Sequence, residues 1–263
     1  MEGCTILPSV LPQKIFLGIP VLNRLDLLER CLDRVDVPAE ILIVNNNTTE
    51  RHFDSRLAAL EEAHGLHVVK PARNLGVAGS WNLILRTAAG RGHEVAFIGS
   101  NDTLLKPGTV AAVWERIENS DPDELIWHAH SWNFFAIHTG AVPRVGWFDE
   151  NFYPAYKEDQ DYSYRCLLAG VKRVGLFLPR LEPEHLGSQT IRSDPEYEAR
   201  NDETHHLWNR PYYMRKWGGD VYEERFTHPF DDPTRDWRWW PDPGASIEER
   251  DWDQERRKAD RAV

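Results

Sequence analysis

The chain has 263 residues, of which 41% are hydrophobic and 28% are charged, a composition typical of a globular protein with a sizeable core. Its formal net charge of -11 argues against a protein that binds nucleic acid mainly by neutralising phosphates. The three cysteines, Cys4, Cys31 and Cys166, are far apart, and this spacing indicates neither a disulfide framework nor a zinc knuckle.

The sequence carries no membrane signal. No run approaches the roughly 18 apolar residues that a membrane span needs. Residues 1–14 (MEGCTILPSVLPQK) have neither the basic start nor the long apolar stretch of a signal peptide. We therefore expect no membrane span and a cytoplasmic location.

The first half of the chain alternates predicted strands with predicted helices. Apolar runs predict strands, and apolar residues at helical spacing predict helices. In chain order these are a strand at 15–19, a helix at 25–35, a strand at 41–44, a helix at 50–64, a strand at 66–69, a helix at 78–89, a strand at 94–98 and a helix at 108–118. This alternation predicts parallel strands covered by helices on both faces, and such sheets bind ligands at the carboxyl ends of their strands.

The pattern changes after residue 120, where two strands close together in sequence favour mixed or antiparallel pairing. The expected elements are strands at 125–128 and 133–138, a helix at 159–169, a strand at 173–178 and a mostly helical stretch at 194–217. From Gly218 onward the chain is charged and rich in tryptophan, without a clear core period. We therefore divide it into a domain over 1–217, with halves at about 14–120 and 121–217, and a tail over 218–263.

Six short segments occur in an order and spacing that are specific to one family. They are PVLNR at 20–24, IVNNNTT at 43–49, NLGVAGSWN at 74–82, SNDT at 100–103, VGWFDE at 145–150 and EDQD at 158–161. Over roughly residues 14–190 the chain resembles glycosyltransferase family 2, the inverting, nucleotide-sugar-dependent enzymes of the GT-A fold. The resemblance implies an α/β fold with a mixed, mostly parallel, Rossmann-like sheet flanked by helices. A helical and aromatic C-terminal extension would follow.

The resemblance implies a divalent cation, Mn²⁺ or Mg²⁺, at the family's Asp-x-Asp signature. Ser100-Asn101-Asp102 corresponds to this signature and keeps only its last acid, so Asp102 is the implied metal ligand. The family often adds a histidine after the last core strand, and His185 lies where that residue would fall; a nitrogen ligand favours Mn²⁺ over Mg²⁺. The alternatives are that Asp102 caps the helix that begins near Pro107 and that His185 is a surface-loop residue.

The acidic pair Glu158-Asp159 matches the position of the family's catalytic base. The resemblance implies that Asp159 is the general base and that Glu158 contacts the acceptor or the sugar. A position at a helix start would keep Asp159 anionic. Asp161 and Arg165 stand four residues apart, which predicts a structural ion pair on one helix face. The alternative for the whole acidic cluster is helix capping.

The donor site implied by the resemblance involves eight residues, and a UDP-sugar is the favoured donor. Asn45 and Asn46 stand where the family has an acid; their amides could pair with a uracil edge or simply form a turn. Glycines before a helix start allow a diphosphate to approach the backbone, and an arginine adds charge. The implied donor-binding residues are Pro20, Asn23, Asn45, Asn46, Arg73, Gly79, Asn82 and Asn101.

The acceptor is the least defined part of the prediction. Trp147 and Tyr156 are the implied acceptor contacts, with Trp147 as a sugar-stacking platform or, equally, a core residue. A glycan, a protein side chain and a modified nucleobase all stay open as acceptors. Two rival functions are a nucleotide-sugar-binding pseudoenzyme and a nucleotidyltransferase. The second is disfavoured because the loop at 20–24 has no glycine.

Overall fold

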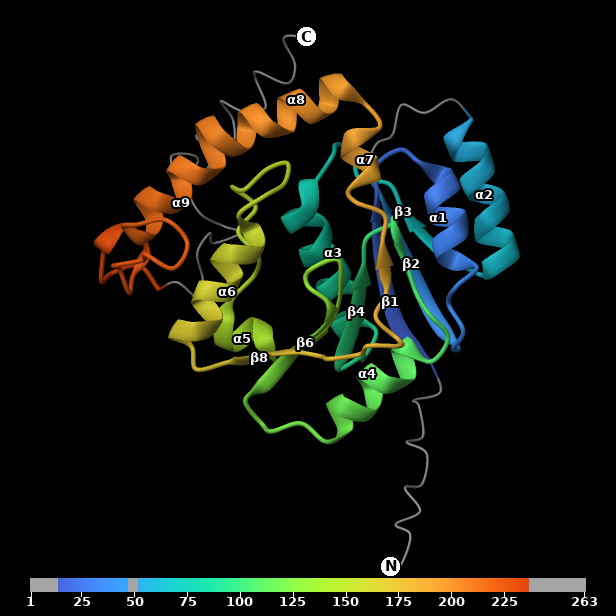
Figure 1. The fold of residues 1–263 in the computed structure, drawn as a ribbon, viewed down its shortest axis with the longest axis horizontal. Coiled ribbons are helices and arrows are strands. Elements are labelled where there is room, and N and C mark those ends of the chain that lie inside the picture. Colours follow the sequence, from blue (N-terminus) through green and yellow to red (C-terminus); the bar gives the residue numbers. More distant parts are fainter. Residues whose placement is uncertain (1–13, 47–51, 237–263) are drawn as a thin grey trace, which may run out of the picture.

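The computed structural model describes residues 14–46 and 52–236 (Figure 1). Its centre is a seven-stranded sheet with the order β3-β2-β1-β4-β7-β6-β8. These strands are β1 (Ile15–Val21), β2 (Ala39–Asn45), β3 (His67–Val69), β4 (Val95–Gly99), β6 (Glu124–His130), β7 (Phe134–His138) and β8 (Lys172–Gly175). β1, β2, β3 and β4 are parallel, whereas β7 runs antiparallel between β4 and β6. The predicted mixed, mostly parallel sheet is confirmed.

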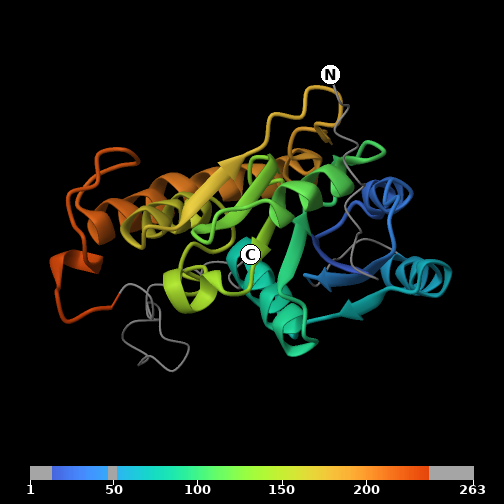
Figure 2. The ribbon, with the colours of Figure 1, turned by 90° about the horizontal axis from the view of Figure 1, so that it is seen from below.

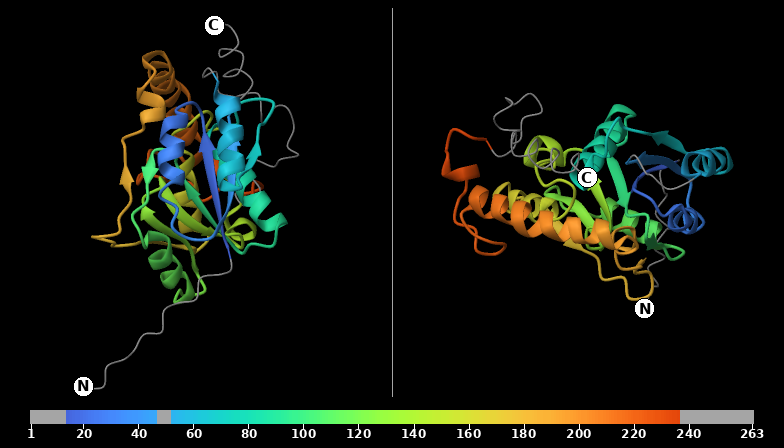
Figure 3. Two further views of the ribbon diagram at one scale, coloured as in Figure 1. Left: turned by 90° about the vertical axis from the view of Figure 1, so that its right-hand side faces the viewer. Right: turned by 90° about the horizontal axis from the view of Figure 1, so that it is seen from above.

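Helices cover both faces of this sheet because its central strands are apolar on both sides. Successive side chains of a strand point to opposite faces, and in β1 Leu17 packs into one core while Phe16 packs into the other. The first core is closed by α1 (Leu25–Leu32), α2 (Phe53–His64) and α4 (Thr109–Glu118). The second is closed by α3 (Gly76–Gly90), α5 (Ala141–Val145) and α6 (Glu158–Leu168). At the β3 end of the molecule α1 and α2 pack against one another (Figures 1 and 3).

One glycine sets the distance between α3 and the sheet. A Cβ added to Gly18 of β1 would lie 2.3 Å from the side chain of Ile84 on α3. The missing side chain therefore lets α3 lie directly on β1. This close packing holds the beginning of α3 near the carboxyl end of β1, where the predicted donor-binding segments meet.

The C-terminal part adds a helical layer over the second half of the sheet. A nearly continuous helical run consists of α8 (Pro195–Thr204), the π-helical turn η1 (His205–Asn209) and α9 (Arg210–Trp217). It lies with α6 at the end of the molecule opposite α1 and α2 (Figure 2). A third core joins the two layers through Phe152, Tyr212, Tyr213 and Trp217. The helical stretch expected at 194–217 is confirmed.

Four short elements gave no sequence signal. They are β5 (Thr103–Leu104), β9 (Glu184–His185), α7 (Gln189–Arg192) and the 3₁₀ turn η2 (Pro229–Asp231). α5 was also not expected. Elements of two to five residues are too short to show a hydrophobic period. In the ranges 14–46 and 52–236, no helix combines the length and apolar character that crossing a membrane requires.

Residues 218–236 pack against the domain. Asp220 accepts hydrogen bonds from Lys157, at 3.0 Å, and from Arg210, at 2.7 Å. The tail's four tryptophans (Trp237, Trp239, Trp240 and Trp252) and Asn47 of the second motif lie outside the described residues. The division of the chain at residue 217 stays a prediction.

Candidate active site

A cavity of about 500 Å³ lies at the carboxyl ends of β1 and β4. Its walls come from six regions: these strand ends, Asn46 after β2, the start of α3, the turn 132–133 between β6 and β7, the loop 154–157 with the start of α6, and the segment 185–205. The parallel strands thus deliver polar residues to one edge of the sheet, as the sequence predicted.

Asp102 and His185 face one another at this cavity. β5 and β9 form a two-residue antiparallel ladder in which Thr103 pairs with His185. The ladder brings His185 Nε2 to 3.3 Å from Asp102 Oδ1. The same carboxylate accepts hydrogen bonds from the Ser100 hydroxyl at 2.7 Å and from the backbone N–H of Gln189 at 2.9 Å. Two chain segments that are distant in the sequence therefore meet at one carboxylate.

The alternative role of Asp102 as the cap of the next helix is excluded. α4 begins at Thr109, and its N-cap residue is Gly108. The backbone N–H of Gly108 donates instead to Asp36, at 2.7 Å. Asp102 is 3% exposed and turned toward the cavity side of the sheet edge, where it binds the segment that carries His185.

The donor set at Asp102 fits a divalent cation that takes most of its ligands from a substrate. Within the described ranges no three His, Cys, Asp or Glu side chains gather as a metal cluster. Asp102 and His185 supply one carboxylate and one imidazole from a shared wall. Mg²⁺ and Mn²⁺ commonly complete their octahedra with phosphate oxygens and water. The pair therefore suits a cation bound together with a diphosphate.

Glu158 and Asp159 begin α6 and both line the cavity. Glu158 is 5% exposed, and burial together with the charge of Asp159 raises its pKa well above the usual range. Burial also raises the pKa of Asp159, although the backbone N–H of Gln160 donates to its carboxylate at 2.8 Å and opposes this shift. Desolvation therefore outweighs the stabilisation that the helix start gives to the charged form, and whether Asp159 is anionic at neutral pH stays a prediction.

The third acid of this motif is structural, as predicted. Asp161 forms an ion pair with Arg165 at 2.8 Å, and both side chains are fully buried. Lys216 of α9 lies 2.7 Å from Asp161 and 2.8 Å from Asp149. Burial alone raises the pKa of Asp161, but the charges of Arg165 and Lys216 outweigh it and the net pKa is lowered. α9 is thus fastened to the helix that begins with Glu158 and Asp159.

Three of the predicted donor-binding residues line the cavity: Pro20, Asn46 and Asn101. The Asn46 amide donates to Ser80, at 2.8 Å, and accepts from the backbone N–H of Leu75, at 3.0 Å. It therefore holds the start of α3 against the sheet edge. Asn101 accepts a hydrogen bond from Thr190, at 3.0 Å.

The other five predicted donor residues lie off the cavity wall. Asn23 contributes its carbonyl oxygen to the Asn101 amide at 3.4 Å. The Asn45 amide is turned to Asp54, at 3.3 Å. Arg73 is exposed, and Gly79 faces the side chains of Leu75 and Glu150. Asn82 exchanges hydrogen bonds of 2.8 and 2.9 Å with the backbone of Phe148 and donates to Glu150.

Of the two predicted acceptor residues, only one lines the cavity. Tyr156 lines the cavity, whereas Trp147 packs at the edge of the second core with the Arg86 guanidinium 4.7 Å from its ring centre. The structure supports the core alternative for Trp147. Cavity residues that the sequence did not single out include Trp81, Trp132, Ser188, Thr190, Ile191, Tyr197 and His205. Several belong to the polar C-terminal segment, which has no period that could reveal an inward face.

A mixed sheet of this order, with an acidic signature after β4 and an acidic helix start beside it, defines a glycosyltransferase of the GT-A fold. The sequence profile of the family described as "Glycosyl transferase family 2" matches residues 17–161, more than half of the chain. The chain therefore belongs to glycosyl transferase family 2.

Solved structures share the fold at low sequence identity. The mannosyltransferase PcManGT from Pyrobaculum calidifontis, in complex with GDP-Man and Mn²⁺, has a TM-score of 0.58 and 18% identity over 79% of this chain and 66% of its own. GalNAc-T7 with UDP, GalNAc and Mn²⁺ has a TM-score of 0.56 and 13% identity over 80% of this chain and 53% of its own. S. aureus TarS 1-349 in complex with UDP has a TM-score of 0.53 and 13% identity over 77% and 74%.

A short stretch also resembles a curated protein. A galactofuranosyl glycosyltransferase from Leishmania donovani is 49% identical over 39 residues, which make up 15% of this chain and 9% of that protein. The chain thus spans less than two thirds of this protein, of PcManGT and of GalNAc-T7.

Proposed function

We propose that the chain transfers a sugar from a nucleotide-diphosphate sugar, with a UDP-sugar favoured, to an acceptor hydroxyl with inversion at the anomeric carbon. One observation carries this proposal: the Asp102–His185 pair and the Asp159 carboxylate line the same cavity. The cavity thus contains both a site for a charged leaving group and a candidate base. A single displacement reaction requires these two groups to lie close together.

In this proposal Asp159 takes the proton of the acceptor hydroxyl while that oxygen attacks the anomeric carbon. The bond from the anomeric carbon to the diphosphate breaks, and the nucleoside diphosphate leaves with its electron pair. A divalent cation bound by Asp102 and His185 would stabilise the negative charge on the leaving diphosphate. Asn46 holds the start of α3 and Asn101 holds α7 at the edge of the cavity that would receive the donor.

Two features of the similar structures support this reading. The structures of PcManGT and GalNAc-T7 are complexes with Mn²⁺, and those of PcManGT, GalNAc-T7 and TarS are complexes with a nucleotide or nucleotide sugar. A donor panel, assayed by release of nucleoside diphosphate with an acceptor mixture present, tests the proposal. Donor binding without any turnover would favour the pseudoenzyme instead.

If Asp102 and His185 bind a metal ion, the binding of a nucleoside diphosphate should be sensitive to a chelator. We expect UDP with Mn²⁺ to raise the melting temperature and EDTA to abolish this rise. His185→Ala is expected to weaken the metal-dependent binding about tenfold or more, because even the outer partners of metal ligands contribute about this much. The matched control is His206→Ala, which changes an exposed histidine. Stabilisation by UDP that survives EDTA would contradict the metal role.

The raised pKa values at the start of α6 predict a particular pH dependence. Asp159 acts as a base only when it is ionised, so kcat/KM is expected to rise with pH through a pKa above 3.8, the ordinary value for this carboxyl. Burial and the charge of Asp159 raise the pKa of Glu158 well above its usual range, which favours the protonated form of Glu158. Glu158→Gln mimics this neutral form. We expect this variant to retain the rise of kcat/KM with pH at the acid side of the profile, and its kcat/KM to stay within several-fold of that of the unaltered chain.

The pH profile of Glu158→Gln is measured beside that of Glu203→Gln, an exposed control on α8. Loss of the acid limb in Glu158→Gln, with its retention in Asp159→Asn, would identify Glu158 as the base.

A further inference from the structure

One wall of the cavity is aromatic and lies mostly outside the part of the chain that matches the family. We call Tyr156, Tyr197 and His205 the aromatic wall; all three line the cavity. The rings of Tyr156 and His205 stand 5.2 Å apart in a T-shaped arrangement. Tyr197 belongs to α8 and His205 to η1, beyond residue 161, where the family match ends. This wall is therefore a feature of the chain's own C-terminal layer.

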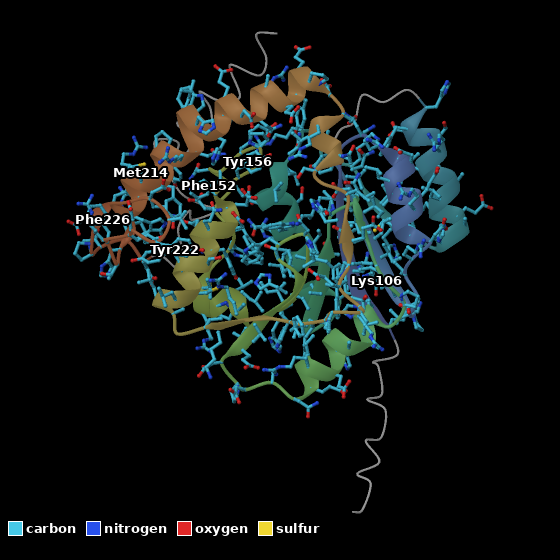
Figure 4. All side chains as sticks on the ribbon, in the orientation of Figure 1. Lys106, Phe152, Tyr156, Met214, Tyr222 and Phe226 are labelled. Atoms are coloured by element: carbon cyan, nitrogen blue, oxygen red, sulfur yellow. The ribbon has the colours of Figure 1, made fainter. Side chains whose placement is uncertain are left out.

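The π-helical turn η1 connects this wall to the loop before α6. Its last residue, Asn209, is fully buried and donates to the carbonyl oxygens of Ala155, at 2.7 Å, and Tyr156, at 3.2 Å. Its first residue, His205, lines the cavity. π-turns inserted in α-helices occur frequently at functional sites. Figure 4 shows Tyr156 beneath the run of α8 and α9, near the start of α3. The same turn thus fixes Tyr156 and contributes His205.

Three polar atoms beside this wall have no hydrogen-bond partner within residues 14–46 and 52–236. They are Glu158 Oε2, Gln160 Oε1 and His205 Nδ1, each of them buried, and all three residues line the cavity. Buried polar groups in proteins are nearly always paired, because an unpaired one loses its hydration without compensation. A ligand whose hydroxyl groups came within hydrogen-bond distance of these atoms would supply the missing partners.

The wall carries little net charge. Burial, followed by the neighbouring His206 and Lys157, lowers the pKa of His205, so this ring is neutral at pH 7. Burial and the charge of Asp159 raise the pKa of Glu158, which favours its neutral form. Lys157, the buried cation that precedes α6, is bound to Asp220 at 3.0 Å. The charge of Asp202 raises the pKa of Tyr156, whereas the charge of Arg192 lowers it. Such a wall offers no concentrated positive charge to a phosphate.

We propose that the aromatic wall is the acceptor subsite and that it takes a neutral sugar ring, one hydroxyl of which meets Asp159. A pyranose ring has apolar C–H faces that pack on tyrosine rings and an edge of hydroxyls that pair with polar groups. The wall provides both, with Tyr156 and Tyr197 for the faces and the three unpaired atoms for the edge. The assignment rests on the proposed function, since it identifies the acceptor of that same reaction.

Saturation-transfer NMR on the full chain tests this subsite without requiring turnover. The probes are the methyl glycosides of glucose, galactose and mannose, with glucose 6-phosphate as the anionic comparison. We expect at least one methyl glycoside to bind and glucose 6-phosphate to bind more weakly. Tyr197→Ala and His205→Ala are expected to weaken glycoside binding about tenfold or more, because the first removes a ring that packs on the sugar and the second removes a hydrogen-bond partner, each a contribution of about this size.

Two further variants keep the result interpretable. Tyr197→Phe retains the ring and is expected to retain binding, so a loss confined to Tyr197→Ala is not an effect of misfolding. Tyr222→Ala changes a tyrosine that is 96% exposed and is expected to bind as the unaltered chain does. Absent glycoside binding, binding equal in Tyr197→Ala and His205→Ala, or tighter binding of glucose 6-phosphate would each overturn the subsite.

The donor-panel assay separates this inference from the proposed function. Nucleoside diphosphate release without glycoside binding refutes the subsite alone. Glycoside binding that depends on Tyr197, without turnover of any donor, refutes the transfer reaction and leaves the subsite in place.

Discussion

Asp159→Asn is expected to lower kcat/KM for sugar transfer by about 10²–10⁴-fold, the usual contribution of a positioned general base. The amide of asparagine cannot accept the acceptor proton, while its size keeps the start of α6 unchanged. Nucleoside diphosphate release with acceptor present measures the effect. Asp33→Asn, the same change at an exposed residue that follows α1, is the matched control and is expected to keep full activity.

The same variant is expected to be as stable as the unaltered chain or more stable at neutral pH. Burial raises the folded-state pKa of Asp159 above its ordinary value. A carboxyl whose folded pKa is raised favours the folded state at low pH, and this contribution is lost as the pH rises through the folded pKa. The ionised side chain therefore opposes folding, and a neutral amide removes this cost. Active sites commonly sacrifice stability for function in this way.

These two readouts together make the test specific. Lost activity with an unchanged or raised melting temperature identifies Asp159 as a base rather than a structural residue. Activity within fivefold of the unaltered chain would remove Asp159 from the mechanism. A lowered melting temperature would show that its carboxylate stabilises the fold.

The sequence predicted the parallel half of the sheet well because its strands are apolar on both faces. β1 and β4 appear as apolar runs, and the residues at or just after the carboxyl end of each strand line the cavity. The Asp102–His185 contact was reached only through the family resemblance. It is made by β5 and β9, two-residue strands that no hydrophobic period could reveal.

The motifs located the right segments but not always the right side chains. In the second motif Asn46 lines the cavity, while Asn45, one position earlier at the end of β2, turns to Asp54. Alternation along an extended chain explains this difference. On α3, Trp81 lines the cavity, and Asn82, about 100° further round the helix, holds the backbone of Phe148. A sequence motif does not specify which way a side chain points from a strand or a helix.

The aromatic wall could not be predicted for a different reason. α8, η1 and α9 are polar helices whose packing relies on single aromatic residues and buried polar groups. Asn209 is fully buried although asparagine is usually exposed. Such contacts are recognisable only when the partner loop is in place.

The contact between α9 and α6 predicts the largest effect on stability in the chain. Lys216 is fully buried between Asp149 and Asp161, at 2.8 and 2.7 Å. Lys216→Met keeps the aliphatic part of this side chain and removes its charge, which leaves two buried carboxylates facing Arg165 alone. Removing one partner of a buried ion pair costs about 3–5 kcal/mol, because the remaining charge has lost its hydration and its counter-charge. Urea unfolding, followed by circular dichroism, measures this difference.

Two comparisons decide whether charge is the cause. Lys172→Met breaks an exposed pair with Asp121, in which the two side chains are 57% and 66% exposed, and is expected to cost about 0–1 kcal/mol. Adding Asp149→Asn to Lys216→Met removes the excess negative charge, so the double variant is expected to regain part of the lost stability. If Lys216→Met costs no more than Lys172→Met, the buried network does not stabilise the fold. If the double variant is the least stable of the three, packing rather than charge explains the loss.

The consequence for catalysis follows from the position of Asp161. It lies two residues after Asp159 on α6, and the indole N–H of Trp217 in α9 also donates to it, at 2.8 Å. Loss of the lysine therefore loosens the helix that carries the proposed base. Folded Lys216→Met is expected to have a lower kcat for transfer, whereas Lys172→Met keeps the value of the unaltered chain. The C-terminal layer would then serve the reaction in two ways, by holding α6 through Lys216 and by lining the cavity through Tyr197 and His205.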